Sequence, residues 1–555
     1  MSKKKFFTSN FLIIIFLNLS LSLNSLNAQN NSSSTQVNTD QTTVDFKIQD
    51  LPNQNNNGSK NLLAKKNTQD SNQEKKLTDP KDKITIENIA SDSSHLHQKI
   101  ITSDKNIKTI SLDEVVKSAV KNYPKILSHY DKIRSLESDL LASRGFFDIR
   151  LKQNYSAKTR GYYDGKTYDA EIEKYLGALG SKVYSGYRKS YGKFAEYDGG
   201  QLTNSQGEFR VGTKFSLLKD RDIDENRLSL ILGKLSIEEG KIELENIKME
   251  IARDATKAYW SWVASGKILQ IYEDLYQLSL NRQKQLQSRA KQGDIAEIVV
   301  VENRKNLLKR KASLVKIRQE FETNCLYLSL FYRDFEAKPI LTTLANIPKI
   351  SLTASKPPSD KELKNSQQLA LTNRPEIRLI KIQNDEEGNK LKLAKNSLQP
   401  QLDVEFGASK DQGAGPQTRS QANNYTNITM SMPLQLSEAR GKIGSSEAKI
   451  SALKYQRSLL EDQIKVEIDQ ILVKILMINE THGLLSEEVK LAELLQNSEV
   501  EKFKHGASNF FLVNIREQDL ASSRAALVEV YKEYQNSLAD YKLAIFDNKD
   551  IAELK

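Results

Sequence analysis

Residues 506–541 read GASNFFLVNIREQDLASSRAALVEVYKEYQNSLADY, and the rest of the chain is best interpreted from this stretch outward. A glycine opens it, and apolar or aromatic residues then recur at a seven-residue step, at Leu520, Leu527, Tyr534 and Tyr541. A heptad of this kind predicts a long helix that packs along a coiled-coil seam.

The same pattern occurs earlier in the chain. Residues 293–328 read GDIAEIVVVENRKNLLKRKASLVKIRQEFETNCLYL, with Leu307, Leu314, Phe321 and Leu328 at the corresponding steps. Each matched pair is 213 positions apart, as 506 − 293 = 213 shows for the two opening glycines. Two copies of one long helix indicate an internally duplicated architecture and not a compact enzyme.

The duplication includes a broken entry helix. Residues 111–145 predict a helix that Ser111 caps, with Glu114 as its capping-box partner. A break is expected near Pro124, and a matching break near Pro375. We therefore divide the chain into six parts: 1–28 signal peptide, 29–108 disordered polar tether, 109–335 first repeat, 336–358 linker, 359–547 second repeat and 548–555 tail.

Each repeat also contains two predicted strands. Apolar and polar residues alternate over 149–157, 208–217, 402–408 and 428–434. Alternation puts one face of a strand in an apolar medium and the other in water, and these runs have the length of a tilted membrane-spanning strand. A soluble, half-buried sheet would give the same alternation. We interpret residues 158–206, rich in tyrosine and glycine, as a large surface loop.

A very long helix follows each strand pair, over residues 224–292 and 438–505. At 1.5 Å per residue each would span roughly 100 Å, and both are too charged to lie in lipid. Each ends at a glycine, Gly293 or Gly506, which can adopt the left-handed conformation that stops a helix. The chain then returns through the heptad stretch.

The N-terminus carries a secretory signal, because Lys3, Lys4 and Lys5 precede a short apolar run and small residues up to Ala28. The net charge of +11 is a mild excess for 555 residues, and no basic cluster is interleaved with aromatics, so a nucleic-acid partner is not expected. One cysteine excludes an intrachain disulfide framework. His95 and His97 form an H-x-H pair in the predicted tether, which we interpret as a solvated pair and not as a metal site. No catalytic motif occurs, so we expect neither an enzyme nor a cofactor.

Four strands are too few to close a barrel in a membrane, and open sheet edges cannot face lipid. If these strands lie in a membrane, several chains must share one barrel. Three chains would supply twelve strands around an aqueous bore, and their helical hairpins would continue it as a hollow cylinder.

Five stretches together resemble the TolC-like outer membrane efflux proteins, and the resemblance covers about residues 109–547. They are 112–126 LDEVVKSAVKNYPKI, 369–378 LALTNRPEIR, 217–235 LLKDRDIDENRLSLILGKL, 432–450 MPLQLSEARGKIGSSEAKI and 506–513 GASNFFLV. The resemblance implies a mainly α fold with membrane β-strands, forming a homotrimer with a twelve-strand β-barrel and a periplasmic α-helical tunnel. It further implies an outer-membrane duct that docks to a periplasmic adaptor and an inner-membrane transporter.

In that family the tips of the helical hairpins close the tunnel, and in some members acidic rings line the constriction. The equivalent positions here are Leu512 and Ile515, which are apolar and could instead gate by excluding water. They could equally pack between helices. Asp294, Glu297 and Glu302 are acidic candidates near the tip of the first repeat.

The resemblance also places adaptor docking at the tips, near Gly293 and Gly506. The side chains implied are Arg304, Lys305, Arg516 and Glu517; the alternative for each is ordinary solvated helix surface. For the whole chain, the alternative is a periplasmic structural coiled-coil protein without a channel. A secreted hydrolase is disfavoured because it would need a catalytic cluster.

Overall fold

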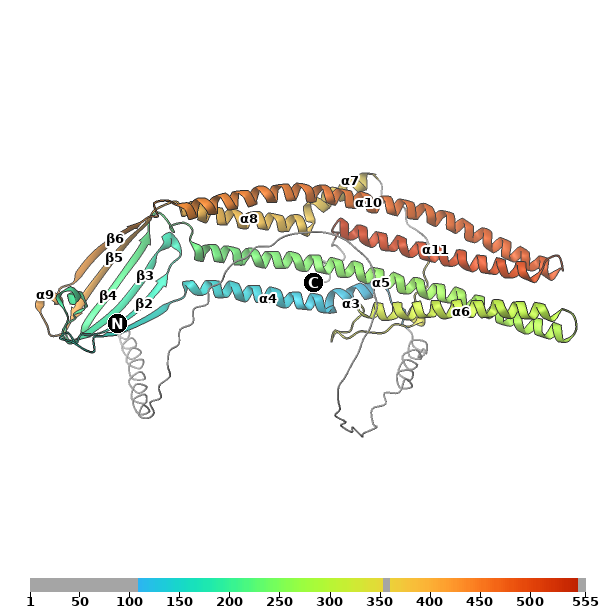
Figure 1. Ribbon diagram of the computed structural model, residues 1–555, viewed down its shortest axis with the longest axis horizontal. Coiled ribbons are helices and arrows are strands. Elements are labelled where there is room, and N and C mark those ends of the chain that lie inside the picture. Colours follow the sequence, from blue (N-terminus) through green and yellow to red (C-terminus); the bar gives the residue numbers. More distant parts are fainter. Residues whose placement is uncertain (1–107, 353–359, 548–555) are drawn as a thin grey trace, which may run out of the picture. The chain divides into compact units, whose positions relative to one another are not determined.

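The computed structural model describes residues 108–352 and 360–547 (Figure 1). The predicted signal peptide, all but the last residue of the predicted tether, and the tail lie outside the described residues. No helix in the described ranges is both long enough and apolar enough to cross a membrane.

The two entry helices are each broken at the predicted proline. Helix α3 (Leu112–Asn122) is followed by α4 (Pro124–Arg144), and α7 (Asp360–Asn373) by α8 (Pro375–Asn396). Each proline occupies the first turn of the second helix, where a missing N–H costs nothing.

The sequence predicted a capping box of two reciprocal hydrogen bonds at the N-terminus of α3, and the structure contains one of them. The Ser111 hydroxyl accepts the Glu114 N–H, as expected. The Glu114 carboxylate instead accepts the Tyr332 hydroxyl at 2.8 Å and pairs with Lys108. The carboxylate therefore ties α3 to the end of the first repeat and does not close a capping box.

Two long helical hairpins follow the predicted bounds within a few residues. The first is α5 (Glu225–Lys291) with α6 (Glu297–Ser329), and the second is α10 (Ser437–Lys504) with α11 (Phe510–Ala544). Helix α11 also packs against α5, so the two hairpins lie side by side (Figure 1). Helices α4 and α8 pack against α5 and α10 respectively.

The heptad positions form the seams of these hairpins. Leu314, Phe321 and Leu328 on α6 are buried in one apolar cluster with residues of α3 and α5. Tyr534 and Tyr541 on α11 are buried in a second cluster with residues of α10. The predicted coiled-coil pattern is confirmed, and burial of these side chains holds each hairpin together.

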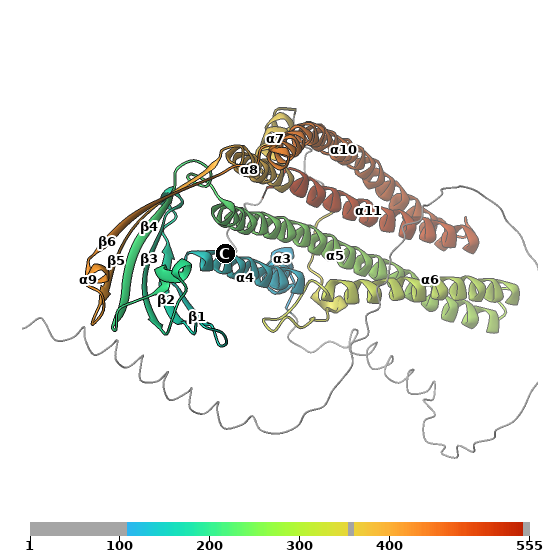
Figure 2. The ribbon, with the colours of Figure 1, turned by 60° about the vertical axis from the view of Figure 1, so that its left-hand side comes forward.

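One antiparallel sheet contains all the strands of the described residues, in the order β1-β2-β3-β4-β5-β6 (Figure 2). The strands are β1 (Arg150–Ala157), β2 (Lys166–Tyr175), β3 (Lys182–Tyr191), β4 (Gly207–Ser216), β5 (Gln401–Gln412) and β6 (Asn423–Ser431). Strands β4 and β5 pair although one comes from each repeat.

The four predicted strands are confirmed as β1, β4, β5 and β6, but the interpretation of residues 158–206 as a loop is wrong. That stretch contains the β2–β3 hairpin, which is inserted between β1 and β4 and pairs with both. Its tyrosine and glycine content suggested a loop, but the charged side chains of β2 and β3 pair with neighbouring strands, as the next section describes.

Candidate functional site

One face of the sheet is apolar and open to its surroundings. Leu151 on β1 is 63% exposed and Ile428 on β6 is 65% exposed, although both are large aliphatic side chains. The same face carries further exposed aromatic and apolar residues from β1, β2, β4, β5 and β6: Tyr155, Tyr168, Ile172, Phe209, Val211, Phe406 and Met430. An apolar surface of this extent requires an apolar environment or a partner.

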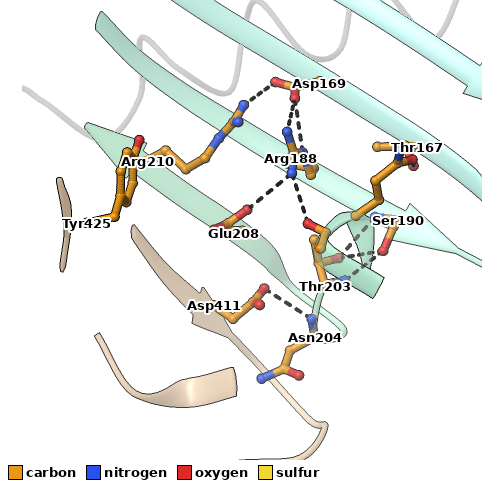
Figure 3. A network of polar contacts seen from close by, with 12 residues as sticks. Thr167, Asp169, Arg188, Ser190, Thr203, Asn204, Glu208, Arg210, Asp411 and Tyr425 are labelled. Carbon is orange, nitrogen blue, oxygen red and sulfur yellow. Dashed lines mark hydrogen bonds and ion pairs between the residues drawn. The ribbon is translucent and has the colours of Figure 1, made fainter. Parts of the chain in front are cut away.

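The opposite face is charged, and its charges are paired across strands. Asp169 on β2 accepts hydrogen bonds from Arg188 on β3 at 2.9 Å and from Arg210 on β4 (Figure 3). Arg188 also pairs with Glu208 at 3.9 Å (Figure 3). Opposite charges on neighbouring strands stabilise their pairing and fix the register.

Ion pairs of the same kind occur at the other end of the sheet. Glu173 on β2 lies between Lys152 on β1, at 2.7 Å, and Lys182 on β3, at 2.8 Å. On β4, Lys214 pairs with Asp403 of β5 at 3.0 Å. The charged face is therefore polar enough for water while carrying few isolated charges.

On the charged face, two tyrosine rings each lie over a glycine of the neighbouring strand. Tyr184 on β3 lies over Gly212 of β4, and Tyr425 on β6 lies over Gly407 of β5, so that a Cβ at either glycine would collide with a ring. The two hydroxyls are 2.6 Å apart, and that of Tyr184 donates to Glu405. Glycine at these two positions lets the rings lie flat and link four strands.

The sheet has two open edges. Within the described residues, β1 pairs only with β2 and β6 pairs only with β5. All nine residues of β6 are exposed. Unpaired N–H and C=O groups along an edge are a template for another strand.

The helical hairpins turn at the two predicted glycines. Gly293 has φ +84° and Gly506 has φ +74°. In both turns the next residue donates its N–H five positions back, from Asp294 to Arg289 and from Ala507 to Lys502. These are the six-to-one hydrogen bonds of a Schellman motif, so the two repeats stop their long helices in the same way.

The structure places the predicted constriction residues at these turns with exposed side chains. Leu512 and Ile515, on the first two turns of α11, are 39% and 37% exposed. Their neighbour Val513 is buried. Asp294, Glu297 and Glu302 are exposed near the turn of the first hairpin. Both sets are accessible in the single chain.

The four side chains predicted for docking divide into two groups. Arg304 and Lys305 are exposed, and Arg516 is half-buried. The Glu517 carboxylate, in contrast, is 2% exposed and lies inside the subunit. It is therefore not available to a partner protein, in contrast to the position that the resemblance implied for it.

Glu517 belongs to an ionic cluster that joins the two hairpins. Its carboxylate accepts from Arg282 of α5 at 2.7 Å and from Arg310 of α6 at 3.2 Å. Arg310 also donates to the Asn514 carbonyl oxygen at 3.0 Å. Burial lowers the pKa of the Arg310 guanidinium, and the Glu517 carboxylate opposes this shift because it stabilises the charged form.

Sequence reasoning missed this cluster, although a signal was present. Asn303 and Arg310 are seven residues apart in α6, at a heptad step that reaches the apolar Ile317. Polar residues at such a position indicate a buried polar contact. Asn303 does meet Gln283 of α5 at this position.

Neither a protein-family model nor a curated protein matches the sequence. Solved outer membrane proteins do match the fold. The open-state outer membrane channel MtrE of Neisseria gonorrhoeae aligns with a TM-score of 0.57 at 11% identity, over 80% of this chain and 94% of that chain. The CmeC outer membrane channel of Campylobacter jejuni gives 0.54 at 12%, over 82% and 94%.

The outer membrane protein VceC of Vibrio cholerae gives a TM-score of 0.54 at 14% identity, over 78% of this chain and 95% of that chain. In each case nearly the whole length of the solved protein is matched. Over about four-fifths of its length, this chain therefore has the fold of the TolC-like outer membrane channels.

Proposed function

We propose that this chain is one subunit of a homotrimeric outer-membrane duct that conducts exported cargo passively. The observation that carries the proposal is the sheet, with an exposed apolar face, a charged face and two open edges. A closed barrel built from several such sheets would place the apolar faces in lipid and the charged faces around water.

Closure also accounts for the edges. The outer strands β1 and β6 run in opposite directions, because six antiparallel strands alternate along the sheet. The β6 strand of one subunit would therefore meet the β1 strand of the next in an antiparallel pair. Lipid cannot hydrogen-bond free backbone groups, so this pairing would satisfy both edges.

The helical hairpins would extend the passage into the periplasm. Helices of 67 and 68 residues are roughly 100 Å long at 1.5 Å per residue, several times the thickness of a bilayer's hydrocarbon core. Contacts between α5 and α11 would hold the hairpins of one subunit side by side. Three subunits would complete a tunnel around one axis.

The ends of the hairpins are the proposed region of contact with a periplasmic adaptor and an inner-membrane pump. Gly293 and Gly506 mark these ends, and Arg304 and Lys305 supply exposed cationic side chains nearby. The duct carries no energy source of its own in this proposal, so the pump must supply it. Leu512 and Ile515 are the proposed constriction, because they are exposed apolar side chains on the first turns of α11.

The experiment is extraction of the full chain from bacterial outer membranes in detergent. A trimer that resists dissociation at room temperature and separates on heating is expected, together with single-channel currents in planar bilayers. A freely soluble periplasmic monomer would instead favour the alternative, a structural coiled-coil protein without a channel.

The docking proposal needs its own test. A photo-crosslinker placed at Arg304 or Lys305 should capture an adaptor protein in living cells. A crosslinker at Lys465, an exposed position in the middle of α10, is the control. Equal capture at both positions would place docking elsewhere.

A further inference from the structure

The inserted hairpin β2–β3 changes the number of strands that each subunit brings to the proposed barrel. We infer that three subunits enclose an eighteen-stranded barrel, whose bore admits larger cargo than twelve strands would. The inference rests on the proposed function, because it requires three chains to close one barrel in a membrane.

The first support is the backbone. Strand β2 pairs with β1 over eight residues and with β3 over ten, and β3 pairs with β4 over seven. The hairpin is thus a continuous part of the sheet. It separates β1 from β4, which would otherwise be neighbours, so a barrel cannot close through this sheet without including it.

The second support is the pattern of side chains on the exposed apolar face, which continues from β1 onto β2. Tyr168 and Ile172 of β2 extend the exposed apolar face, in line with Tyr155 and Leu151 of β1. Strand β2 would therefore meet lipid along the same band as its neighbours, while β3 adds the exposed Tyr191 to this face beside the polar Ser185 and Lys189.

The third support is that side chains attach the hairpin to the strands on both sides of it. Glu173 pairs with Lys152 of β1, while Asp169 bonds to Arg210 of β4 (Figure 3). Tyr184 reaches past β4 to Glu405 of β5 and Tyr425 of β6. These contacts lie on the charged face, and detaching the hairpin would break all of them at once.

The insertion also preserves the conditions for closure. Two added strands keep the number per subunit even, so the joint between β6 and the next β1 stays antiparallel. Adding one strand would have made that joint parallel.

Strand number sets the width of the bore. Strands about 4.8 Å apart and tilted by about 40° give backbone diameters of about 24 Å for twelve and about 36 Å for eighteen. Side chains take about 5 Å on each side, half the spacing of packed sheets. The open width would then be about 14 Å or about 26 Å. The structure thus assigns the membrane segment to bulky cargo, and leaves size selection to the helical ends.

The decisive measurement is electron cryo-microscopy of the full-length trimer in lipid nanodiscs. Eighteen strands in the plane of the lipid are expected. A trimer with twelve strands, and with residues 158–206 outside the barrel, would overturn this inference and leave the proposed function intact. Absence of any membrane-embedded trimer would instead overturn the proposed function.

A second measurement probes the width of the bore directly. Asn427, an exposed residue on the charged face of β6, is changed to cysteine and labelled from the extracellular side with polyethylene glycol maleimides of graded size. The native Cys325 should stay unlabelled, because burial raises the pKa of its thiol to about 12.

The comparison is with a chain in which Asn-Gly replaces residues 158–206. Ala157 and Gly207 both lie on the apolar face, so this turn keeps the inward and outward alternation of β1 and β4. The largest label that reacts should shrink to about half its diameter. Asp169→Asn, which changes charge but not strand number, should leave the limit unchanged. An unchanged limit in the shortened chain would overturn the inference, and if that chain fails to fold the strand count still decides.

Discussion

The two repeats share one helical plan but differ in their strands and at their turns. The first repeat supplies four strands and the second supplies two. At the turns, the first hairpin exposes Asp294 and Glu297, while the second exposes Leu512 and Ile515. The helical plan that the repeats share is what a duplicated coiled coil requires. The differences lie at the strands and the turns, where cargo and partner proteins would contact the proposed duct. Four experiments test these differences between the repeats and the contacts that join them.

The largest effect is expected at the ionic cluster between the hairpins. Glu517→Ala removes the carboxylate that pairs with two guanidinium groups, that of Arg310, which is buried, and that of Arg282, which is mostly buried. Removing one partner of a buried ion pair costs about 3–5 kcal/mol. The temperature at which the helical circular dichroism signal is lost should fall clearly. Glu302→Ala, at an exposed position of α6, is the matched control and should change little. Similar temperatures for both variants would mean that the hairpins are held together by their apolar contacts alone.

The second effect concerns which hairpin lines the constriction. Leu512→Asp with Ile515→Asp adds two carboxylates per chain, and a ring of them should lower the blocking concentration of a trivalent cation by about tenfold. Single-channel currents in planar bilayers measure this. Asp294→Asn with Glu297→Gln removes charge from the other hairpin and should leave block nearly unchanged. The reverse outcome would assign the constriction to the first repeat.

The third effect tests whether the two turns are equivalent. Gly293→Ala and Gly506→Ala force a side chain into a left-handed conformation, at a cost of about 1–2 kcal/mol each. Gly483→Ala, inside α10 with open space around it, should instead stabilise by about 0.5–1 kcal/mol. The midpoint of thermal unfolding should therefore fall for both turn variants and rise slightly for Gly483→Ala, relative to the unchanged chain. Unequal losses at the two turns would show that one of them bears additional contacts.

The smallest effect lies where the repeats meet. Burial, followed by repulsion from Glu386 and Glu243, raises the pKa of Glu239. A raised pKa in the folded state means that its ionisation weakens the fold as pH rises through that value. Glu239→Gln should therefore stabilise slightly at pH 7 and make no difference at pH 4.

The neighbouring Glu387 should behave in the opposite way. Although burial disfavours its charge, Lys390 and Lys449 hold the pKa of Glu387 below its usual range. Its stabilising effect is present at neutral pH and is lost progressively as pH falls through the lowered pKa, so Glu387→Gln should destabilise more at pH 7 than at pH 4. Thermal unfolding at the two pH values checks both variants. Shifts of the same sign at pH 7 would contradict the assignment.

Much of the fold followed from local patterns. The heptads predicted the seam residues, prolines predicted the breaks at Pro124 and Pro375, and glycines predicted both turns. The alternation predicted β1, β4, β5 and β6 because each has apolar residues at every second position. Strand β2 carries the same alternation in Tyr168, Ala170 and Ile172. The loop interpretation gave too much weight to the glycines around it, which are typical of turns, and too little to the tyrosines, which favour strands.

Local sequence patterns were enough to predict the duplication, the lengths and ends of the helices, and the alternation of apolar and polar faces in four strands, since each depends on residues close together in the chain. The folded chain was needed to show that β2 and β3 join the sheet and that Glu517 is buried between the hairpins. The reason is that both depend on partners far apart in sequence: Asp169 with Arg210, Tyr184 with Glu405, and Glu517 with Arg282. A charged residue shows its own polarity in a sequence, but whether it meets water or an opposite charge depends on the packing of distant segments.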